Sequence, residues 1–218
     1  MKNLDQRNQI IEFSLKLNST NLSPLRSGNI SLRAKEDDKD GYLITPSGKK
    51  YDSLKSENII FMGLNEEPEN TDPGNKPSSE WRFHRDIYLN KKDAQAIVHA
   101  HSPHATAVSS HGKSVPPFHY MIALAGGEDI KCSEYATFGT KELSDNVINA
   151  LTNRSACLMS NHGQVAFGKN LEEAFELAQE IENICQQYII ALKIGEPKIL
   201  SFEEMKKVLD KAKNYKKG

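Results

Sequence analysis

The amino-acid sequence predicts a layered α/β domain whose sheet is largely antiparallel, and three observations lead to this fold class. The chain has 218 residues, of which 38% are hydrophobic and 26% charged, as expected for one soluble domain with a full core. Amphipathic helical patterns and short apolar strands are intermixed along it. They do not follow a strict strand–helix–strand alternation, so a purely parallel sheet is not expected.

The first part of the chain predicts one helix and three strands. Residues 4–17 carry apolar side chains at helical spacing, so an opening helix is expected. A glycine turn at Gly28 then enters a strand that ends near residue 32. The acidic run 37–41 predicts a hairpin turn, and residues 42–44 return as the second strand. A third short strand is expected over 58–63.

The middle of the chain predicts two helices around a buried strand. One helix is expected to begin at Ser78, Ser79 and Glu80, which offer a serine cap and an acidic first turn, and to continue to about residue 89. The continuous apolar run over 96–100 predicts a buried strand. Residues 140–151 have the amphipathic spacing of a second helix.

The last part of the chain predicts a strand pair followed by two helices. An apolar strand over 157–159 leads into a turn, and residues 165–167 continue as the next strand. A long amphipathic helix is expected over 171–192, and it should end before a glycine and a proline. A short helix over 202–213 is expected to close the chain.

Composition and segment patterns exclude several classes of function. The formal net charge of −1 gives no basic surface for nucleic acid, and the lysine-rich residues 206–217 are expected to form a solvated helix face. The first ten residues lack a signal-peptide apolar stretch, and no apolar run is long enough to cross a bilayer. Three widely spaced cysteines, Cys132, Cys157 and Cys185, do not suggest a disulfide framework. A cytoplasmic protein without membrane partners is therefore expected.

Three histidines form the most informative pattern. Side chains two residues apart on a strand point to one face, so His99 and His101 can reach the same point in space. His162 follows another apolar strand and can complete a set of three imidazoles with one open side. This arrangement is typical of catalytic zinc sites rather than closed structural ones. The pattern alone leaves open whether these histidines bind a metal or are structural.

Three short polar turns are candidate phosphate sites, since backbone N–H groups aided by hydroxyls bind anions. The turns contain Gly28 and Asn29, Ser47 and Gly48, and Ser78 and Ser79. Each turn taken alone is better explained as an ordinary cap or turn, so only the three turns together indicate a phosphate site. Glu80, which follows the last pair, can complement a helix dipole or act as a base beside a phosphate pocket and a metal.

Taken together, these segments resemble the class II aldolase family, and the resemblance spans nearly the whole chain. Five short motifs occur in the family's order: Ser27–Ser31, Thr45–Gly48, Ser78–His84, His99–Ser102 and Asn161–Gly163. The stretches 119–127 and 135–140 resemble the fuculose-phosphate aldolase branch in particular. The epimerase branch carries an aspartate and a threonine where this chain has Glu80 and Trp81.

The resemblance implies the class II aldolase fold, a single three-layer domain over residues 1–218 with helices flanking a central sheet. It implies one Zn2+ per subunit, held by His99, His101 and His162. Glu80 matches a glutamate that can ligate the metal and act as the catalytic base. The polar turns match a phosphate pocket formed by Gly28, Asn29, Ser47, Gly48, Ser78 and Ser79.

The resemblance also implies a homotetramer whose active sites lie at subunit interfaces. Tyr120 matches a tyrosine that reaches the neighbouring subunit's site and donates a proton, and Phe138 and Tyr215 match residues at the aldehyde end. The chain departs from the family at Arg26, where small residues are usual. Arg26 either adds a cation near the phosphate or forms a surface salt bridge. The remaining histidines, His84, His104, His111 and His119, are not expected to be ligands.

The implied reaction is the reversible cleavage of a ketose 1-phosphate, similar to L-fuculose 1-phosphate, into dihydroxyacetone phosphate and a short aldehyde. Two alternatives within the same fold are an aldolase for 5-deoxyribulose 1-phosphate and a methylthioribulose 1-phosphate dehydratase. A different class is a non-catalytic binding module like the adducin head. That module is expected to lack the metal histidines and the glutamate, all of which this sequence has.

Overall fold

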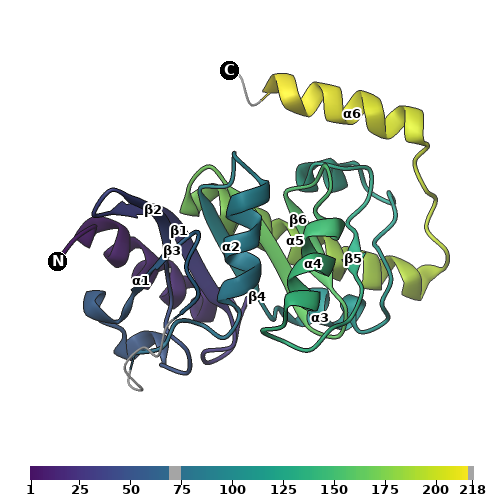
Figure 1. Cartoon of the computed structure of the whole chain (residues 1–218). Coiled ribbons are helices and arrows are strands. Elements are labelled where there is room, and N and C mark those ends of the chain that lie inside the picture. The colour runs from purple at the N-terminus through teal and green to yellow at the C-terminus, as the bar shows by residue number, and fades with distance from the viewer. Residues whose placement is uncertain (69–74, 216–218) are drawn as a thin grey trace.

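A seven-stranded sheet organises the part of the chain that the computed structural model describes, residues 1–68 and 75–215 (Figure 1). The strands are β1 (Asn29–Glu36), β2 (Lys39–Ile44), β3 (Ile60–Gly63), β4 (Ala96–Ala100), β5 (Cys132–Ser133), β6 (Ala156–Met159) and β7 (Gly163–Gly168). Their order in the sheet is β3-β2-β1-β4-β7-β6-β5. Only β5 and β6 pair in parallel among these strands, so the predicted, largely antiparallel sheet is confirmed.

Helices cover both faces of this sheet (Figure 1). They are α1 (Leu4–Ser19), α2 (Trp81–Asn90), α3 (Pro103–Ser109), α4 (Lys141–Ala150), α5 (Leu171–Ile194) and α6 (Phe202–Tyr215), with 3-10 turns η1 (Tyr51–Ser53), η2 (Ser56–Asn58) and η3 (Tyr120–Ala125). One core lies between the sheet and α1, α3 and α5. A second core lies between the sheet and α2 and α4, which gives three layers.

The alternation of side chains along β4 assigns its residues to these two cores. Val98 and Ala100 pack with α1 and α5, whereas Ile97 packs with α2. His99 follows Ile97 on the α2 face, and its ring centroid lies 5.4 Å from that of Phe83 in α2. The period of two in a strand therefore directs His99 toward the beginning of α2.

Several element boundaries differ from the sequence prediction. The hairpin turn is confined to Asp37 and Asp38, both with positive φ, because β1 continues to residue 36. The predicted serine cap of α2 is wrong: Glu80 occupies the N-cap position, no side chain caps the helix, and the first turn holds no acidic residue. The elements α3, β5 and η3 were not predicted, because they are too short to show a period.

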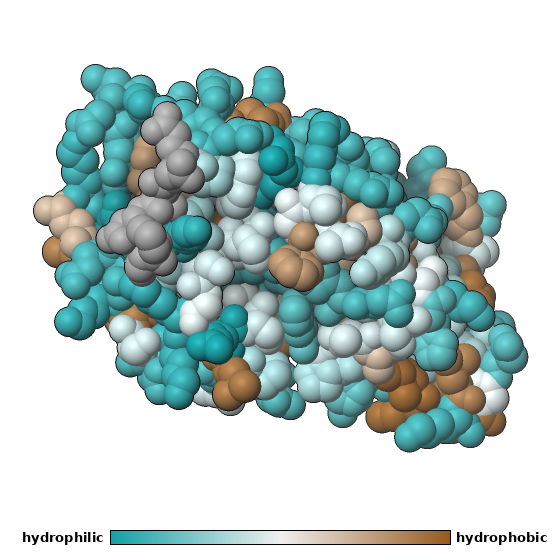
Figure 2. Space-filling model, turned by 60° about the horizontal axis from the view of Figure 1, so that its bottom comes forward, coloured by the Kyte–Doolittle hydropathy of each residue, from teal (hydrophilic) through white to brown (hydrophobic). Residues whose placement is uncertain are grey.

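The C-terminal helix α6 follows an extended segment and packs against η3 at its beginning (Figure 1). The backbone N–H of Leu200 donates to the Pro117 carbonyl, and Met205 is fully buried. In the view of Figure 2 the surface is largely hydrophilic, with hydrophobic side chains gathered at one end. None of the helices in the described residues has the length and apolar character needed to cross a membrane.

Candidate metal centre

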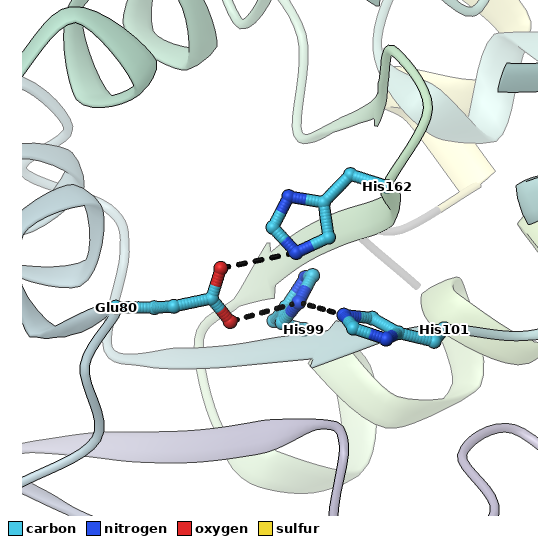
Figure 3. Close-up of side chains that lie close together, drawn as sticks. All are labelled: Glu80, His99, His101 and His162. Atoms are coloured by element: carbon cyan, nitrogen blue, oxygen red, sulfur yellow. Dashed lines mark hydrogen bonds and ion pairs between the residues drawn. The ribbon is translucent and has the colours of Figure 1, made fainter. Parts of the chain in front are cut away.

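Four side chains from three distant segments meet beside the end of β4 (Figure 3). His99 belongs to β4 and His101 follows it, His162 lies in the turn before β7, and Glu80 immediately precedes α2. One potential ligand atom from each of these residues lies within 4.8 Å of the other three. The structure thus brings together the three histidines and the glutamate that the sequence singled out.

The polar atoms of this cluster face one another at short distances. His99 Nε2 lies 2.9 Å from His101 Nε2 and 3.1 Å from Glu80 Oε2. Glu80 Oε1 lies 3.0 Å from His162 Nε2. Among the described residues, however, this buried oxygen has no partner in hydrogen-bonding geometry. A buried carboxylate oxygen left without a hydrogen bond in the middle of three imidazoles fits a bound cation.

A carbonyl group sets the orientation of the His99 ring. His99 Nδ1 lies 2.8 Å from the backbone oxygen of Gln164 in β7, and a carbonyl can only accept. His99 Nδ1 therefore carries the hydrogen and donates it. In the neutral ring, Nε2 then presents its lone pair to the cluster. Metal-binding histidines usually have this kind of support on the nitrogen that does not bind the metal.

The electrostatics of the cluster favour a neutral His101 and an ionised Glu80. Burial and the neighbouring rings of His99 and His162 lower the pKa of His101 to about 3. Burial by itself raises the pKa of a carboxyl group, but the adjacent His99 and His162 outweigh it and hold the pKa of Glu80 well below its usual range. Neutral imidazole nitrogens and an ionised carboxylate are common ligands of zinc and related divalent cations.

Two glycines let the neighbouring segments approach β4 closely. A Cβ at Gly163 would lie 2.4 Å from the Ala100 carbonyl oxygen, and one at Gly28 would lie 2.6 Å from the His99 carbonyl oxygen. Any larger residue would push these segments away from the strand. The segment before β1 and the beginning of β7 are thereby packed directly against the backbone that carries His99 and His101.

The three polar turns named from the sequence lie around the same region. Ser47 N–H donates to the Lys76 carbonyl (2.8 Å) and Ser78 N–H donates to the Thr45 carbonyl (3.0 Å), so these two turns run side by side. Arg26 connects the loop before β1 to them, because its guanidinium donates to the Gly48 carbonyl at 2.8 Å. Asn29 then touches the cluster itself: its Nδ2 donates to Glu80 Oε2 at 2.9 Å.

A cleft of about 310 Å³ opens over the cluster. Its lining includes Ser79, Glu80, His101 and His162, together with Ser27, Tyr135, Ala136, Phe138 and Asn161. Phe138, which the resemblance assigns to the aldehyde end, is among these lining residues. Tyr135, which is 60% exposed, and Asn161 had no predicted role. The motif and stretch that contain them were recognised, but no pattern in the sequence marks an individual residue as lining a cleft.

Several predicted residues are not among the described residues that line this cleft. Of the six predicted phosphate residues, Ser79 lines it, whereas Gly28, Asn29, Ser47, Gly48 and Ser78 do not. Tyr120 lies in η3, is 56% exposed, and is not among the described residues that line the cleft. This position is compatible with the prediction that it acts in a neighbouring subunit. The side chain of Tyr215 lies outside the described residues.

Comparison with known protein families tests the family resemblance that the sequence motifs indicated. The family described as the class II aldolase and adducin N-terminal domain matches residues 8–189. The chain belongs to this family. The match includes all four residues of the metal cluster and the segments of the polar turns.

Individual aldolases are similar over almost their whole length. The L-fuculose phosphate aldolase of Escherichia coli strain K12 is 46% identical over 208 residues, which cover 95% of this chain and 94% of that protein. The 5-methylthioribulose-1-phosphate/5-deoxyribulose-1-phosphate aldolase of Rhodospirillum rubrum is 44% identical over 209 residues, covering 96% of this chain and 91% of that protein.

A solved structure of an L-fuculose 1-phosphate aldolase aligns with a TM-score of 0.90, at 37% identity and 98% coverage of both chains. The predicted class II aldolase fold is confirmed. The predicted aldehyde-lyase class is confirmed as well, since the relatives named above are aldolases. The non-catalytic, adducin-like alternative also expected the metal cluster to be missing, whereas this member of the family has it complete.

Proposed function

We propose that this class II aldolase is a zinc enzyme that reversibly cleaves a ketose 1-phosphate into dihydroxyacetone phosphate and a short aldehyde. The observation that carries the proposal is the cluster of Glu80 with three imidazoles, which opens onto a cleft beside polar turns. The similar aldolases are named for L-fuculose phosphate and for 5-deoxyribulose-1-phosphate. We further propose a cytoplasmic homotetramer, as the family resemblance implies.

The residues of the cluster fit a zinc ion. His99, His101 and His162 would hold it as neutral ligands, and Glu80 would be a fourth ligand when no substrate is bound. A divalent metal held in this way supplies Lewis acidity, which stabilises negative charge that develops on the substrate oxygens when the carbon–carbon bond breaks. Three uncharged imidazoles leave the full positive charge of the ion available for that purpose.

Glu80 and Tyr120 would carry the proton transfers. In the direction of aldol addition, Glu80 removes the carbon-bound proton of dihydroxyacetone phosphate and holds it on its carboxylate. Its depressed pKa keeps the carboxylate ionised before the reaction. Tyr120 of the neighbouring subunit would then donate a proton to the aldehyde oxygen, which fits its exposed position away from its own chain's cleft.

The polar turns would bind the phosphate group at the other end of the substrate. Ser47 and Gly48 approach Ser78 and Ser79 through the backbone hydrogen bonds between their segments. The two serines come just before Glu80, the N-cap residue of α2, whose N-terminal N–H groups favour an anion. The guanidinium of Arg26, already bonded to the Gly48 carbonyl, adds positive charge on this side.

A substrate panel tests this function. Purified protein is incubated with L-fuculose 1-phosphate, 5-deoxyribulose 1-phosphate and 5-methylthioribulose 1-phosphate, and the release of dihydroxyacetone phosphate is measured. We expect release from at least one of them, its loss after metal removal by a chelator, and its return on adding Zn2+. Loss of water from 5-methylthioribulose 1-phosphate without release of dihydroxyacetone phosphate would instead identify a dehydratase and contradict the proposal.

A further inference from the structure

A chain of buried polar side chains runs from Glu80 away from the cleft, between the sheet and α2. It consists of Asn29 and Ser31 of β1 and His84 and Tyr88 of α2. Ser31 and His84 are fully buried, Tyr88 is 2% exposed and Asn29 is 4% exposed. Because these groups cannot reach bulk water, each must find its hydrogen-bond partner inside the protein.

The placement of the Asn29 amide sets the directions of the first two hydrogen bonds. Its Nδ2 faces Glu80 Oε2 at 2.9 Å, and an amide nitrogen can only donate. The amide oxygen of Asn29 then faces His84 Nε2 at 2.5 Å. Since this oxygen can only accept, the hydrogen of the neutral His84 ring must be on Nε2.

The remaining hydrogen bonds of this network are donated in the same direction, toward Glu80. Burial lowers the pKa of His84 to about 3, so the ring is neutral and carries a single N–H. His84 Nδ1 is therefore an acceptor, and it receives the hydroxyl hydrogen of Ser31 at 2.7 Å. Ser31 Oγ in turn accepts from the Tyr88 hydroxyl at 2.8 Å. Each of these buried side chains therefore donates a hydrogen bond to the next residue on the way to Glu80.

We propose that His84 is a positioning residue for Glu80: its Nε2–H holds the Asn29 amide in the one orientation that offers an N–H to the carboxylate. The two ends of an amide have nearly the same shape, so packing alone does not prevent Asn29 from turning over. A reversed amide would place its oxygen against Glu80 Oε2 and repel it. The proposal rests on the proposed role of Glu80 as the catalytic base.

A purely structural role is the competing explanation. The His84 ring stacks on Phe83 with a centroid distance of 4.7 Å, and a buried ring of this size contributes to the core whatever it donates. The two explanations differ in what a replacement must retain. Packing requires only volume, whereas positioning requires an N–H beside the Asn29 oxygen.

Two substitutions at this position separate volume from donation. His84→Met fills similar space without a donor, whereas His84→Gln retains an amide N–H that can reach Asn29. For His84→Met we expect kcat to fall about 10- to 100-fold, as is usual when a supporting partner is removed, with KM and bound metal nearly unchanged. His84→Gln should recover most of the lost kcat. Equal loss in both variants, or wild-type kcat in His84→Met, would overturn the proposal.

Ser31→Ala tests the same proposal at a different residue, in case His84→Met does not fold. It removes the donor to His84 Nδ1 while leaving the ring in place, and we expect a several-fold lower kcat. Ser14→Ala is the matched control, because Ser14 is also fully buried but, within the described part of the chain, its hydroxyl bonds only to the Ile10 carbonyl of its own helix. Equal kcat in the two serine variants would count against the proposal.

A readout that does not depend on activity is the tautomer of His84. The 15N chemical shifts of its two ring nitrogens, measured by NMR in the wild-type protein, should report a hydrogen on Nε2. A hydrogen on Nδ1 would overturn the proposal even in an active enzyme. Conversely, failure of the wild type to release dihydroxyacetone phosphate would refute the proposed function and leave the tautomer result standing.

Discussion

At the scale of single residues, Glu80 is held from two sides by groups of different kinds. His99 and His162 approach its two carboxylate oxygens from the side of the cleft. Asn29 donates to Glu80 Oε2 from the interior. A carboxylate with an ionised resting state, a fixed direction and an adjacent cation site has the features expected of a general base.

Glu80→Gln tests this role directly. The amide has nearly the same shape, so we expect the variant to fold and to bind metal through the three histidines. It cannot accept the substrate proton, so turnover should fall by about 10²- to 10⁴-fold. The measurement is the rate of dihydroxyacetone phosphate release together with the metal content. Glu66→Gln, at a half-exposed surface carboxylate, serves as the control, and full activity in Glu80→Gln would remove the assignment.

His84 also makes a prediction about stability. Its pKa falls from 6.5 to about 3 on folding, so between these values the unfolded chain binds a proton that the folded protein does not. Folding stability should therefore decrease as the pH falls below 6.5, by up to about 1.4 kcal/mol per pH unit from this one group.

The contribution of His84 is isolated by comparing urea unfolding of the metal-free wild type and His84→Gln at pH 5.0 and 6.5. The variant should show a smaller loss of unfolding free energy over this interval. His111→Gln, at an exposed histidine, should keep the wild-type difference. Identical pH dependence in wild type and His84→Gln would contradict the burial of a neutral ring.

At the scale of elements, the sequence predicts the strands and long helices well because their periods are read locally. The strand over 96–100 is found with the expected bounds, and the helix expected from residue 171 is extended by only two residues at its end. The prediction that failed for an informative reason is the serine cap at the beginning of α2. Glu80 after two serines fits the rule for a capped helix, but its carboxylate turns toward the histidines, and this tertiary interaction cannot be read from neighbouring residues.

The end of β4 depends on the close contact with Gly163. An added Cβ would lie 2.4 Å from the Ala100 carbonyl oxygen, so Gly163→Ala must move β7 or the adjacent His162. We expect a loss of unfolding free energy of about 1–3 kcal/mol, as for other overpacked sites, and weaker metal binding. Urea denaturation and metal titration measure the two effects.

Gly195→Ala is the matched control for this substitution. A Cβ there meets no described atom within 4 Å, so it carries backbone strain at φ 149° without a clash. It should not alter metal affinity. Unchanged stability and metal binding in Gly163→Ala would show that the contact with β4 does not constrain the site.

At the scale of the whole molecule, strand order explains why distant motifs form one site. β4 lies between β1 and β7, so Asn29 pairs with His99 on one side and Gln164 pairs with Ala100 on the other. His162, two residues before Gln164, therefore arrives beside His101. The sequence alone identifies the three candidate histidines and Glu80, but only the order of the strands makes them neighbours.

The proposed assembly predicts complementation between two defective variants. Tyr120→Phe and Glu80→Gln subunits would each form homotetramers with little activity. If Tyr120 serves the site of the neighbouring subunit, a mixed tetramer contains some interfaces that combine an intact Glu80 with an intact Tyr120. We therefore expect co-expression to restore a substantial fraction of wild-type activity. Activity no higher than the average of the two variants would argue against a shared site.

The proposed function depends most on three imidazoles and one carboxylate holding a single divalent metal ion. The direct measurement is the metal content of the purified protein by elemental analysis, for the wild type and for His99→Ala. We expect one zinc ion per chain in the wild type and a loss of both metal and activity in the variant. A wild-type protein that binds no divalent metal at its cluster, or a His99→Ala variant that retains it fully, would contradict the account.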